Sequence, residues 1–372
     1  MKLTSCLSAE LHSPAFIYDI DQLRESLGLL DSLRISTGCK LLYSIKALPL
    51  TALLKQMLPL VDGFSVSSLF EARLAHEVLA KQTGSIHITT PGLRLDEFEE
   101  IAALCTHVSF NSLSQMQRLE SVASGFSKGL RINPKLSALA DPRFDPCRQH
   151  SKLGIDIAQL NPDHLTDIEG LHFHNSFAAE DFYNLDKTLQ KLLPVLQKIN
   201  PKWINLGGGY IFSETSELNH FVELIDYLKR RLDIEVFIEP GKSIIGRCGY
   251  LVTTVIDKFI SDGKAILVVD TSVNHHPEIF EYQKQPQLLA ATGAHQAIVA
   301  GSSCLAGDIL GEYAFDRIPE PGDQLLFADV GAYSLIKASR FNGYNLPDVY
   351  FFEDNQLINI KRYDYLQYRD HW

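Results

Sequence analysis

Short β-type runs alternate with helical patterns along residues 40–240, and this alternation is the feature that most constrains the fold. The β-type runs are short and mainly apolar. In the stretches between them, apolar residues recur at spacings of three and four, which is the helical signal. The strand candidates are Lys40–Ala47, Gly63–Ser68, Ser85–Thr90, His107–Asn111, Gly129–Asn133, Glu169–Asn175, Trp203–Leu206 and Glu235–Glu239. The helix candidates are Ser68–Ala80, Asp96–Leu104, Ser112–Val122, Tyr183–Ile199 and Glu217–Leu232.

Strands that alternate with helices form right-handed βαβ units, which build a parallel sheet. Eight such units close into a (β/α)8 barrel of the TIM type. An open, doubly wound α/β sheet is the alternative architecture. The count of eight strand candidates favours the barrel.

The pattern changes after about Gly246, where short β runs are separated by Gly, Pro and Asn and long helical patterns are scarce. These runs are Leu251–Ile260, Lys264–Asp270, His295–Ala300, Asp323–Asp329 and Val349–Phe352. They predict a β-rich C-terminal domain, a small barrel or sandwich. We expect a barrel domain over 20–245 and the β-rich domain over 246–372. The strand-like segment Pro14–Tyr18, within residues 1–19, is expected to add a strand to the second domain.

The bulk composition excludes several classes of function. A chain of 372 residues is long enough for two domains. The net charge of -11 disfavours nucleic acid or an anionic membrane as a partner and is compatible with a cationic substrate. Neither a membrane span nor a secretory signal is expected. The six cysteines are scattered without a CxxC pair, so we expect reduced thiols, a cytoplasmic protein and no metal site.

Reactive side chains gather at the carboxyl ends of the predicted strands, where a barrel of this type places its active site. Lys46 lies near the end of the first strand, Ser67 and Ser68 end the second, and Glu71 lies one turn into the next helix. His174 lies near the end of the sixth strand, Gly207–Gly209 follow the seventh, and Glu239-Pro240-Gly241 end the eighth. Each group has an ordinary structural explanation, such as a turn. Their convergence on one barrel mouth favours a catalytic site.

Lys46 sits in the apolar run Leu41–Ala47. Burial of an ammonium is costly, and such groups often lose their charge instead. A neutral amine is a nucleophile toward carbonyls, so Lys46 is a candidate Schiff-base former. The ordinary alternative is a lysine whose head reaches water or pairs with a carboxylate.

The glycine triplet and Glu239 indicate which carbonyl compound the lysine would hold. Three residues without Cβ let backbone N–H groups approach an anion, and phosphate sites after strands seven and eight are common in this fold. A lysine beside a phosphate site suggests pyridoxal phosphate or a sugar-phosphate aldolase. Glu239 favours pyridoxal phosphate, because a carboxylate keeps its pyridine nitrogen protonated. His174 would lie flat against the ring.

Taken together, these motifs resemble the fold-type III pyridoxal phosphate decarboxylases, the alanine racemase-like barrel group that includes ornithine and diaminopimelate decarboxylases. Within that family the chain is most similar to the carboxynorspermidine and carboxyspermidine decarboxylases. The similarity extends from Ala15–Asp19 to Phe341–Tyr344. The supporting segments are Ser67–Leu74, Phe110–Ser112, Leu130–Pro134, Ser151–Gly154, Gly207–Phe212 and Gly301–Ile309.

The resemblance implies roles for the cofactor-binding residues. Lys46 would hold the cofactor covalently, His174 would stack on its ring, and Glu239 would pair with the pyridine nitrogen. The phosphate would bind to Gly207, Gly208 and Gly209 with help from Tyr333. We also place Ser68 and Gly241 among the cofactor contacts.

The resemblance also implies a homodimer with shared active sites. Cys304 matches a cysteine that comes from the partner subunit and reprotonates the substrate carbon. Asp308 matches an acidic position near the distal amine of cationic substrates. We assign His276 and Glu278 to substrate binding, and the β-rich domain to the dimer interface and the active site.

Two stretches depart from the closest family pattern, and both lie where substrate side chains would be recognised. A glutamate is expected shortly after the stacking histidine, but the run here is His174–Glu180 with the glutamate at its end. The stretch Asn274–Glu278 also differs.

The leading hypothesis is pyridoxal phosphate-dependent decarboxylation of an amino acid with an aminocarboxypropyl group, carboxynorspermidine or carboxyspermidine in polyamine biosynthesis being the best candidates. The alternatives are the same decarboxylation on another scaffold, as in a natural-product pathway or on another diamino acid, a non-catalytic pyridoxal phosphate-binding homologue, and a Schiff-base aldolase.

Overall fold

The computed structural model describes residues 11–372 apart from 138, 140, 163–164, 166 and 214–216. The chain divides into two compact units. The barrel unit comprises Ser26–Ser243, and the sheet unit comprises Ile244–Trp372 together with the N-terminal residues up to Glu25. No described helix has the length and apolar character needed to cross a membrane. Cys6 lies outside the described residues; the other five cysteines are free thiols.

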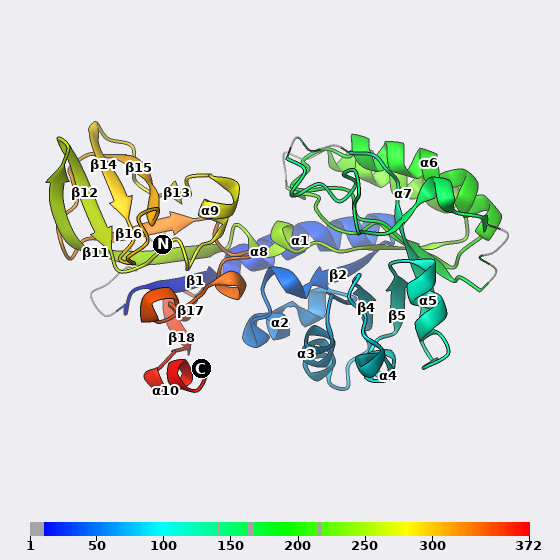
Figure 1. The fold of residues 1–372 in the computed structure, drawn as a ribbon. Helices are drawn as coiled ribbons and strands as arrows, with labels where there is room; N and C mark the ends of the chain where they lie inside the picture. Colours follow the sequence, from blue (N-terminus) through cyan, green and yellow to red (C-terminus); the bar gives the residue numbers. More distant parts are fainter. Residues whose placement is uncertain (1–10, 138, 140, 163–164, 166, 214–216) are drawn as a thin grey trace. The chain divides into compact units, whose positions relative to one another are not determined.

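Eight parallel strands of the described residues form a closed ring in the barrel unit. Figure 1 traces the chain of this unit from blue through cyan to green. They are β2 (Lys40–Ser44), β3 (Gly63–Val66), β4 (Ser85–Thr89), β5 (His107–Phe110), β6 (Ser127–Asn133), β8 (Gly170–His172), β9 (Trp203–Asn205) and β10 (Glu235–Ile238). The pairing of β10 with β2 closes the ring, which confirms the predicted barrel and excludes the open sheet. A two-residue strand, β7 (Ile155–Asp156), pairs with β6 outside the ring.

The predicted helices appear as α3 (Leu69–Leu79), α4 (Leu95–Leu104), α5 (Leu113–Leu119), α6 (Tyr183–Ile199) and α7 (Leu218–Arg231). Three further helices were not predicted: α1 (Ile20–Thr37), α2 (Thr51–Met57) and α8 (Lys242–Ile245). In α1 the buried residues Leu23, Leu27, Leu30 and Leu33 follow helical spacing, and Asp19 caps the first turn by accepting from the N–H groups of Asp21 and Gln22. The described residues between β6 and β8 contain no α-helix, only the 3₁₀ turn η4 (Ile157–Gln159).

Rings from β4, β5, β9 and β10 pack against one another within the barrel unit. The Trp203 ring packs with Leu42 and Phe237 in one buried cluster. A Cβ at Gly170 would lie 1.9 Å from the Trp203 ring, so glycine is required there. His87 stacks on His107 with ring centroids 3.8 Å apart and planes 15° apart. His87 is buried, and neither of its ring nitrogens has a hydrogen-bond partner among the described residues.

This histidine pair should make the stability of the barrel fall in acid. Burial lowers the pKa of His87 well below its ordinary value, helped by His107, and burial lowers the pKa of His107 to about 4. The unfolded chain therefore takes up protons on these rings at a higher pH than the folded barrel. The free energy of unfolding should be at its full value above about pH 6.5 and should decrease as the pH falls toward about 4.

Urea unfolding at about pH 7.5 and about pH 4.5 measures this loss. The control is His87→Phe, which keeps a flat ring and cannot be protonated. The wild type should lose about 1–2 kcal/mol more than the variant on acidification. Equal losses in the two proteins would contradict the assignment.

The described residues of the sheet unit form nine strands. They are β1 (Ala15–Asp19), β11 (Gly249–Ser261), β12 (Lys264–Val269), β13 (Gln287–Leu288), β14 (His295–Ala300), β15 (Ile309–Phe315), β16 (Gln324–Ala328), β17 (Asp348–Glu353) and β18 (Gln356–Lys361). The N-terminal strand β1 pairs antiparallel with β11 and parallel with β17. Two short helices, α9 (Glu278–Tyr282) and α10 (Tyr365–Arg369), accompany them. The strands β13, β15 and β18 were not predicted.

Candidate active site

Lys46 lies in a 3₁₀ turn, η2 (Ile45–Ala47), that directly follows β2. The N–H of Ser44 donates to the carbonyl of Pro240 (3.0 Å), which ties the end of β2 to the segment after β10. The Lys46 side chain is open to solvent, yet protein atoms surround it on most sides. Desolvation is the main cause that lowers its pKa, and Arg131 adds to the shift while Glu239 opposes it. The structure thus provides an accessible amine that deprotonates more easily than an ordinary lysine.

Glu239 is a buried carboxylate in the same barrel end. Its Oε1 accepts a hydrogen bond from Nδ2 of Asn205 (2.8 Å), and its Oε2 lies 3.5 Å from Nε2 of His172. Burial by itself would raise the pKa of Glu239, but His172 and Lys46 together lower it well below its ordinary value. The carboxylate is therefore ionised and can accept a proton-bearing nitrogen.

The pKa values of the histidines at the end of β8 and just after it, His172 and His174, are shifted toward the neutral form. Burial lowers the pKa of His172, and burial and the Lys46 charge lower the pKa of His174 well below its ordinary value. Nδ1 of His174 accepts a hydrogen bond from the N–H of Gly208 (3.1 Å), so the single proton of this ring lies on Nε2. His174 thus presents a neutral, oriented ring.

The glycine triplet after β9 packs against its neighbours more tightly than any other residue could. A Cβ would lie 2.4 Å from the carbonyl of Phe173 at Gly207, 2.3 Å from that of Glu239 at Gly208, and 2.0 Å from that of Ser176 at Gly209. Gly207 and Gly209 also have positive φ angles, +68° and +90°. Packing alone therefore accounts for part of this motif.

Two of the three N–H groups of the triplet already have hydrogen-bond partners within the protein, which limits the donors that are left for a phosphate. The N–H of Gly207 donates to Oδ1 of Asn205 (2.9 Å), and that of Gly208 is engaged by His174. Only the N–H of Gly209 has no hydrogen-bond partner among the described residues. We expected all three N–H groups to donate to the phosphate. In this structure Gly209 supplies the one N–H of the triplet that is available for it.

The other predicted cofactor contacts of the barrel unit are Ser68 and Gly241, and both belong to turns that follow strands of the ring. The Ser68 hydroxyl caps α3 by accepting from the N–H of Glu71 (3.2 Å). Gly241 faces the lysine turn, since a Cβ there would lie 2.9 Å from Cβ of Ala47. Direct contacts of Ser68 and Gly241 with the cofactor stay predictions.

Three groups of the site had no role in our sequence interpretation. Arg131 is buried on β6, and burial lowers its pKa to about 10, so it remains a cation that acts on Lys46 and Glu239. His172 and Asn205, the last residues of β8 and β9, both face Glu239. The sequence signal for Arg131 was its position as a charged residue between the apolar residues Leu130 and Ile132.

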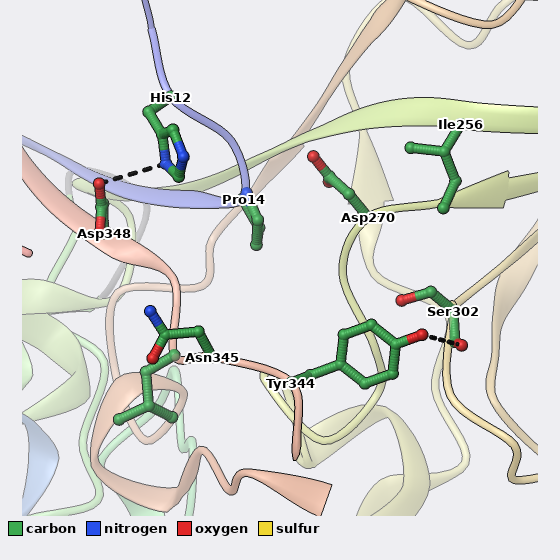
Figure 2. A pocket seen from close by; sticks show the side chains of 9 residues that line it. His12, Pro14, Ile256, Asp270, Ser302, Tyr344, Asn345 and Asp348 are labelled. Atoms are coloured by element: carbon green, nitrogen blue, oxygen red, sulfur yellow. Dashed lines mark hydrogen bonds and ion pairs between the residues drawn. The ribbon is translucent and has the colours of Figure 1, made fainter. Parts of the chain in front are cut away.

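Cys304 lies in the loop between β14 and β15 of the sheet unit, and its side chain is exposed. Its N–H donates to Oδ1 of Asn342 (2.8 Å). The hydroxyl of Tyr344 donates to the carbonyl of Ser302 in the same loop (2.6 Å), and this tyrosine forms one wall of a cavity of about 280 Å³ (Figure 2). The loop that carries Cys304 is thus anchored from the segment before β17.

Asp308 holds the other side of this loop, and its predicted contact with a substrate amine stays a prediction. Its Oδ1 accepts from the N–H of Val273 (2.8 Å), and its Oδ2 accepts from the N–H (3.0 Å) and the hydroxyl of Ser303. The side chain is 2% exposed. Both oxygens are occupied by the protein itself, so we regard Asp308 as a support of the Cys304 loop.

The remaining predicted residues also belong to the sheet unit. His276 is buried, and its Nδ1 hydrogen-bonds with Oγ of Ser334 (2.7 Å), next to Tyr333. Tyr333 has a positive φ of 60°. Glu278 is buried at the start of α9. The structure joins the His276 segment to the Tyr333 loop; their substrate and phosphate contacts stay predictions.

Comparison with known proteins decides the family. A family profile described as pyridoxal-dependent decarboxylase, C-terminal sheet domain, matches residues 15–331. This chain belongs to the pyridoxal-dependent decarboxylases.

Individual relatives within the family are similar over nearly their whole length. The carboxynorspermidine/carboxyspermidine decarboxylase of Campylobacter jejuni is 31% identical over 96% of this chain and 98% of the relative. The carboxyaminopropylagmatine decarboxylase of Synechocystis is 32% identical over 92% of this chain and 90% of the relative. A crystal structure of C. jejuni carboxynorspermidine decarboxylase complexed with norspermidine superposes with a TM-score of 0.86 at 29% identity, covering 97% of this chain and 100% of that chain.

The barrel end of this decarboxylase fits pyridoxal phosphate, its cofactor. Lys46 offers an accessible amine of lowered pKa, Glu239 an ionised carboxylate for the pyridine nitrogen, and Gly209 a free N–H for the phosphate. When bound, pyridoxal phosphate accepts the electron pair that remains when carbon dioxide leaves the substrate. The described residues contain no cluster of His, Cys, Asp and Glu that could hold a metal ion.

Proposed function

We propose that this decarboxylase acts on an amino acid with an aminocarboxypropyl group, and that carboxynorspermidine or carboxyspermidine is its substrate. The observation that carries the proposal is the similarity to relatives with this named activity over almost the entire length of both chains. The solved relative that carries norspermidine supports it. The net charge of -11 is favourable for a polyamine substrate.

A second candidate substrate is carboxyaminopropylagmatine. The Synechocystis relative of that name is as similar to this chain as the carboxynorspermidine decarboxylases are. This would be the same decarboxylation on another scaffold. The departure of the His174–Glu180 run from the expected family pattern motivates keeping this candidate.

Release of carbon dioxide from a panel of substrates tests the proposal. The panel contains carboxynorspermidine, carboxyspermidine, carboxyaminopropylagmatine and diaminopimelate, and the products are identified by mass. We expect one of the first three to have the highest kcat/KM. A preference for diaminopimelate, or no turnover of any panel member, would overturn it.

The residue roles in the barrel unit form part of the same proposal. Lys46 receives the aldehyde of the cofactor, Glu239 binds its pyridine nitrogen, and the neutral ring of His174 covers its face. Gly209 binds the phosphate, and Tyr333, Ser68 and Gly241 are further proposed cofactor contacts. Substrate side chains are recognised by His276 and Glu278.

Cys304 is proposed to protonate the substrate carbon after carbon dioxide leaves. Its exposed position, on a loop anchored by Asn342 and Asp308, supports this role. Replacement of Cys304 by Ala should lower kcat by about 10²-fold or divert the proton to another atom, while cofactor absorbance is kept. Unchanged turnover with an unchanged product would refute the role.

We further propose a cytoplasmic homodimer in which the sheet unit forms part of the interface and completes the partner's active site. Exposed apolar side chains on and beside the Cys304 loop support an interface: Leu305 is 37%, Ile309 42% and Phe341 49% exposed. The free cysteines are compatible with a reducing compartment. Co-assembly of Lys46→Ala with Cys304→Ala chains should give a normal-product kcat well above that of either variant alone; a kcat no higher than that of the Cys304→Ala protein would count against shared sites.

A further inference from the structure

We propose that Asn205 is a positioning residue that sets the carboxylate of Glu239 and the glycine triplet at a fixed separation, so that one side chain aligns the groups that hold the two ends of the cofactor. This inference rests on the proposed roles of Glu239 and the triplet.

Asn205 is the last residue of β9 and is completely buried. Its Nδ2 donates to Oε1 of Glu239 (2.8 Å), and its Oδ1 accepts from the N–H of Gly207 (2.9 Å). The N–H of Glu239 in turn donates to the carbonyl of Gly207 (2.8 Å). The segments after β9 and after β10 are therefore joined both through the backbone and through this amide.

Only an amide serves both partners at once. An asparagine carries a donor on one side and an acceptor on the other, and the carboxylate and the N–H of this site require that pair. Aspartate has the same shape, but it has no donor for Glu239 and would place a second negative charge beside it. The chemistry of the two partners thus specifies asparagine, not merely a polar residue.

The amide acts on Glu239 in two ways. A hydrogen bond donated to the ionised form favours that form, which keeps the carboxylate available to a protonated pyridine nitrogen. With Oε1 engaged, rotation of the carboxylate is restricted and Oε2 is fixed beside His172, 3.5 Å from its Nε2. A preorganised acceptor of this kind is more effective than one that must reorient.

The same amide also holds Gly207, the first residue of the triplet, in place. Gly207 has a φ of +68°, and its N–H bond to Asn205 holds this turn. The next N–H, that of Gly208, fixes the ring of His174. Three hydrogen bonds and the Gly207–Gly208 peptide bond therefore connect Glu239, the proposed pyridine partner, to His174, the proposed stacking ring.

The test compares Asn205→Asp with Gln115→Glu in the holoenzyme and after reconstitution with pyridoxal phosphate. Gln115 is also a buried amide that donates and accepts, but its partners are the backbone of Thr90, Pro91 and Asn111. The readouts are the dissociation constant of the cofactor, the pH midpoint of its absorbance change, and Tm. We expect Asn205→Asp to weaken cofactor binding about 10- to 100-fold and to shift the pH midpoint, and Gln115→Glu to change neither.

Equal losses of Tm in both variants, with cofactor affinity and pH midpoint unchanged in Asn205→Asp, would overturn the inference. If Asn205→Asp does not fold, Asn205→Ala removes both bonds without adding charge and is expected to change the same two cofactor readouts. Glu239→Gln in the same assays distinguishes a failure of the proposed role of Glu239 from a failure of the positioning role of Asn205. A normal pH midpoint in Glu239→Gln would refute the role of Glu239, whereas a shift there without one in the Asn205 variants would refute only the positioning role.

Discussion

Lys46→Ala is expected to lose the visible absorbance of the bound cofactor and at least about 10³-fold in kcat. The barrel places this amine in η2 at the end of β2, open to solvent but desolvated enough to lower its pKa. Alanine removes the only atom of residue 46 that can bond to an aldehyde. Absorbance spectra and single-substrate kinetics on the purified variant measure both effects.

The matched control is Lys40→Ala at the other end of the same strand. Lys40 lies 3.6 Å from Asp62 in an ion pair that is partly exposed, so its loss should cost little stability. Lys40→Ala should keep the spectrum and the turnover of the wild type. A coloured and active Lys46→Ala protein would show that another lysine carries the cofactor.

Glu239→Gln should lower kcat by about 10²- to 10³-fold, which is the usual effect of removing one preorganised electrostatic group. The variant keeps the shape of the side chain and still has an oxygen for Asn205, so the barrel should fold. It lacks the negative charge that would keep a pyridine nitrogen protonated. The absorbance of the bound cofactor should therefore be retained while its pH dependence changes.

Glu235 provides the control for this change because it lies on the same strand, β10, and is exposed. Glu235→Gln should leave kcat and the spectrum unaltered. A Glu239→Gln protein with wild-type kcat would exclude a role for the carboxylate in catalysis.

The architecture of the barrel was predictable because its strands are short apolar runs bounded by turns. All eight predicted strands lie in the ring, although the structure ends β2 at Ser44 and β8 at His172, earlier than the runs suggested. In both places the chain leaves the sheet directly before a proposed cofactor-binding side chain, Lys46 or His174. The strands β15 and β18 were missed since polar and charged residues interrupt their pattern, as in Ile309–Phe315.

Members of the candidate site could be predicted from sequence when their own chemistry is unusual for their surroundings. They could not be predicted when their importance depends on which residues contact them in the fold. Lys46 and Glu239 are conspicuous beside apolar strands. Asn205 and His172 were missed since their roles depend on Glu239, which lies on another strand. Asp308 was assigned to the substrate by its resemblance to an acidic position of the family, and the structure shows that its oxygens accept from Val273 and Ser303. The sequence alone does not show whether a carboxylate already accepts hydrogen bonds from other residues of the protein.

Borohydride reduction of the purified holoenzyme, followed by peptide mass mapping, tests the central claim most directly, since it marks the lysine that is joined to the cofactor. The expected result is a pyridoxyl group on Lys46 and on no other lysine. A pyridoxyl group on a different lysine, or a protein that carries none after reconstitution with pyridoxal phosphate, would contradict it.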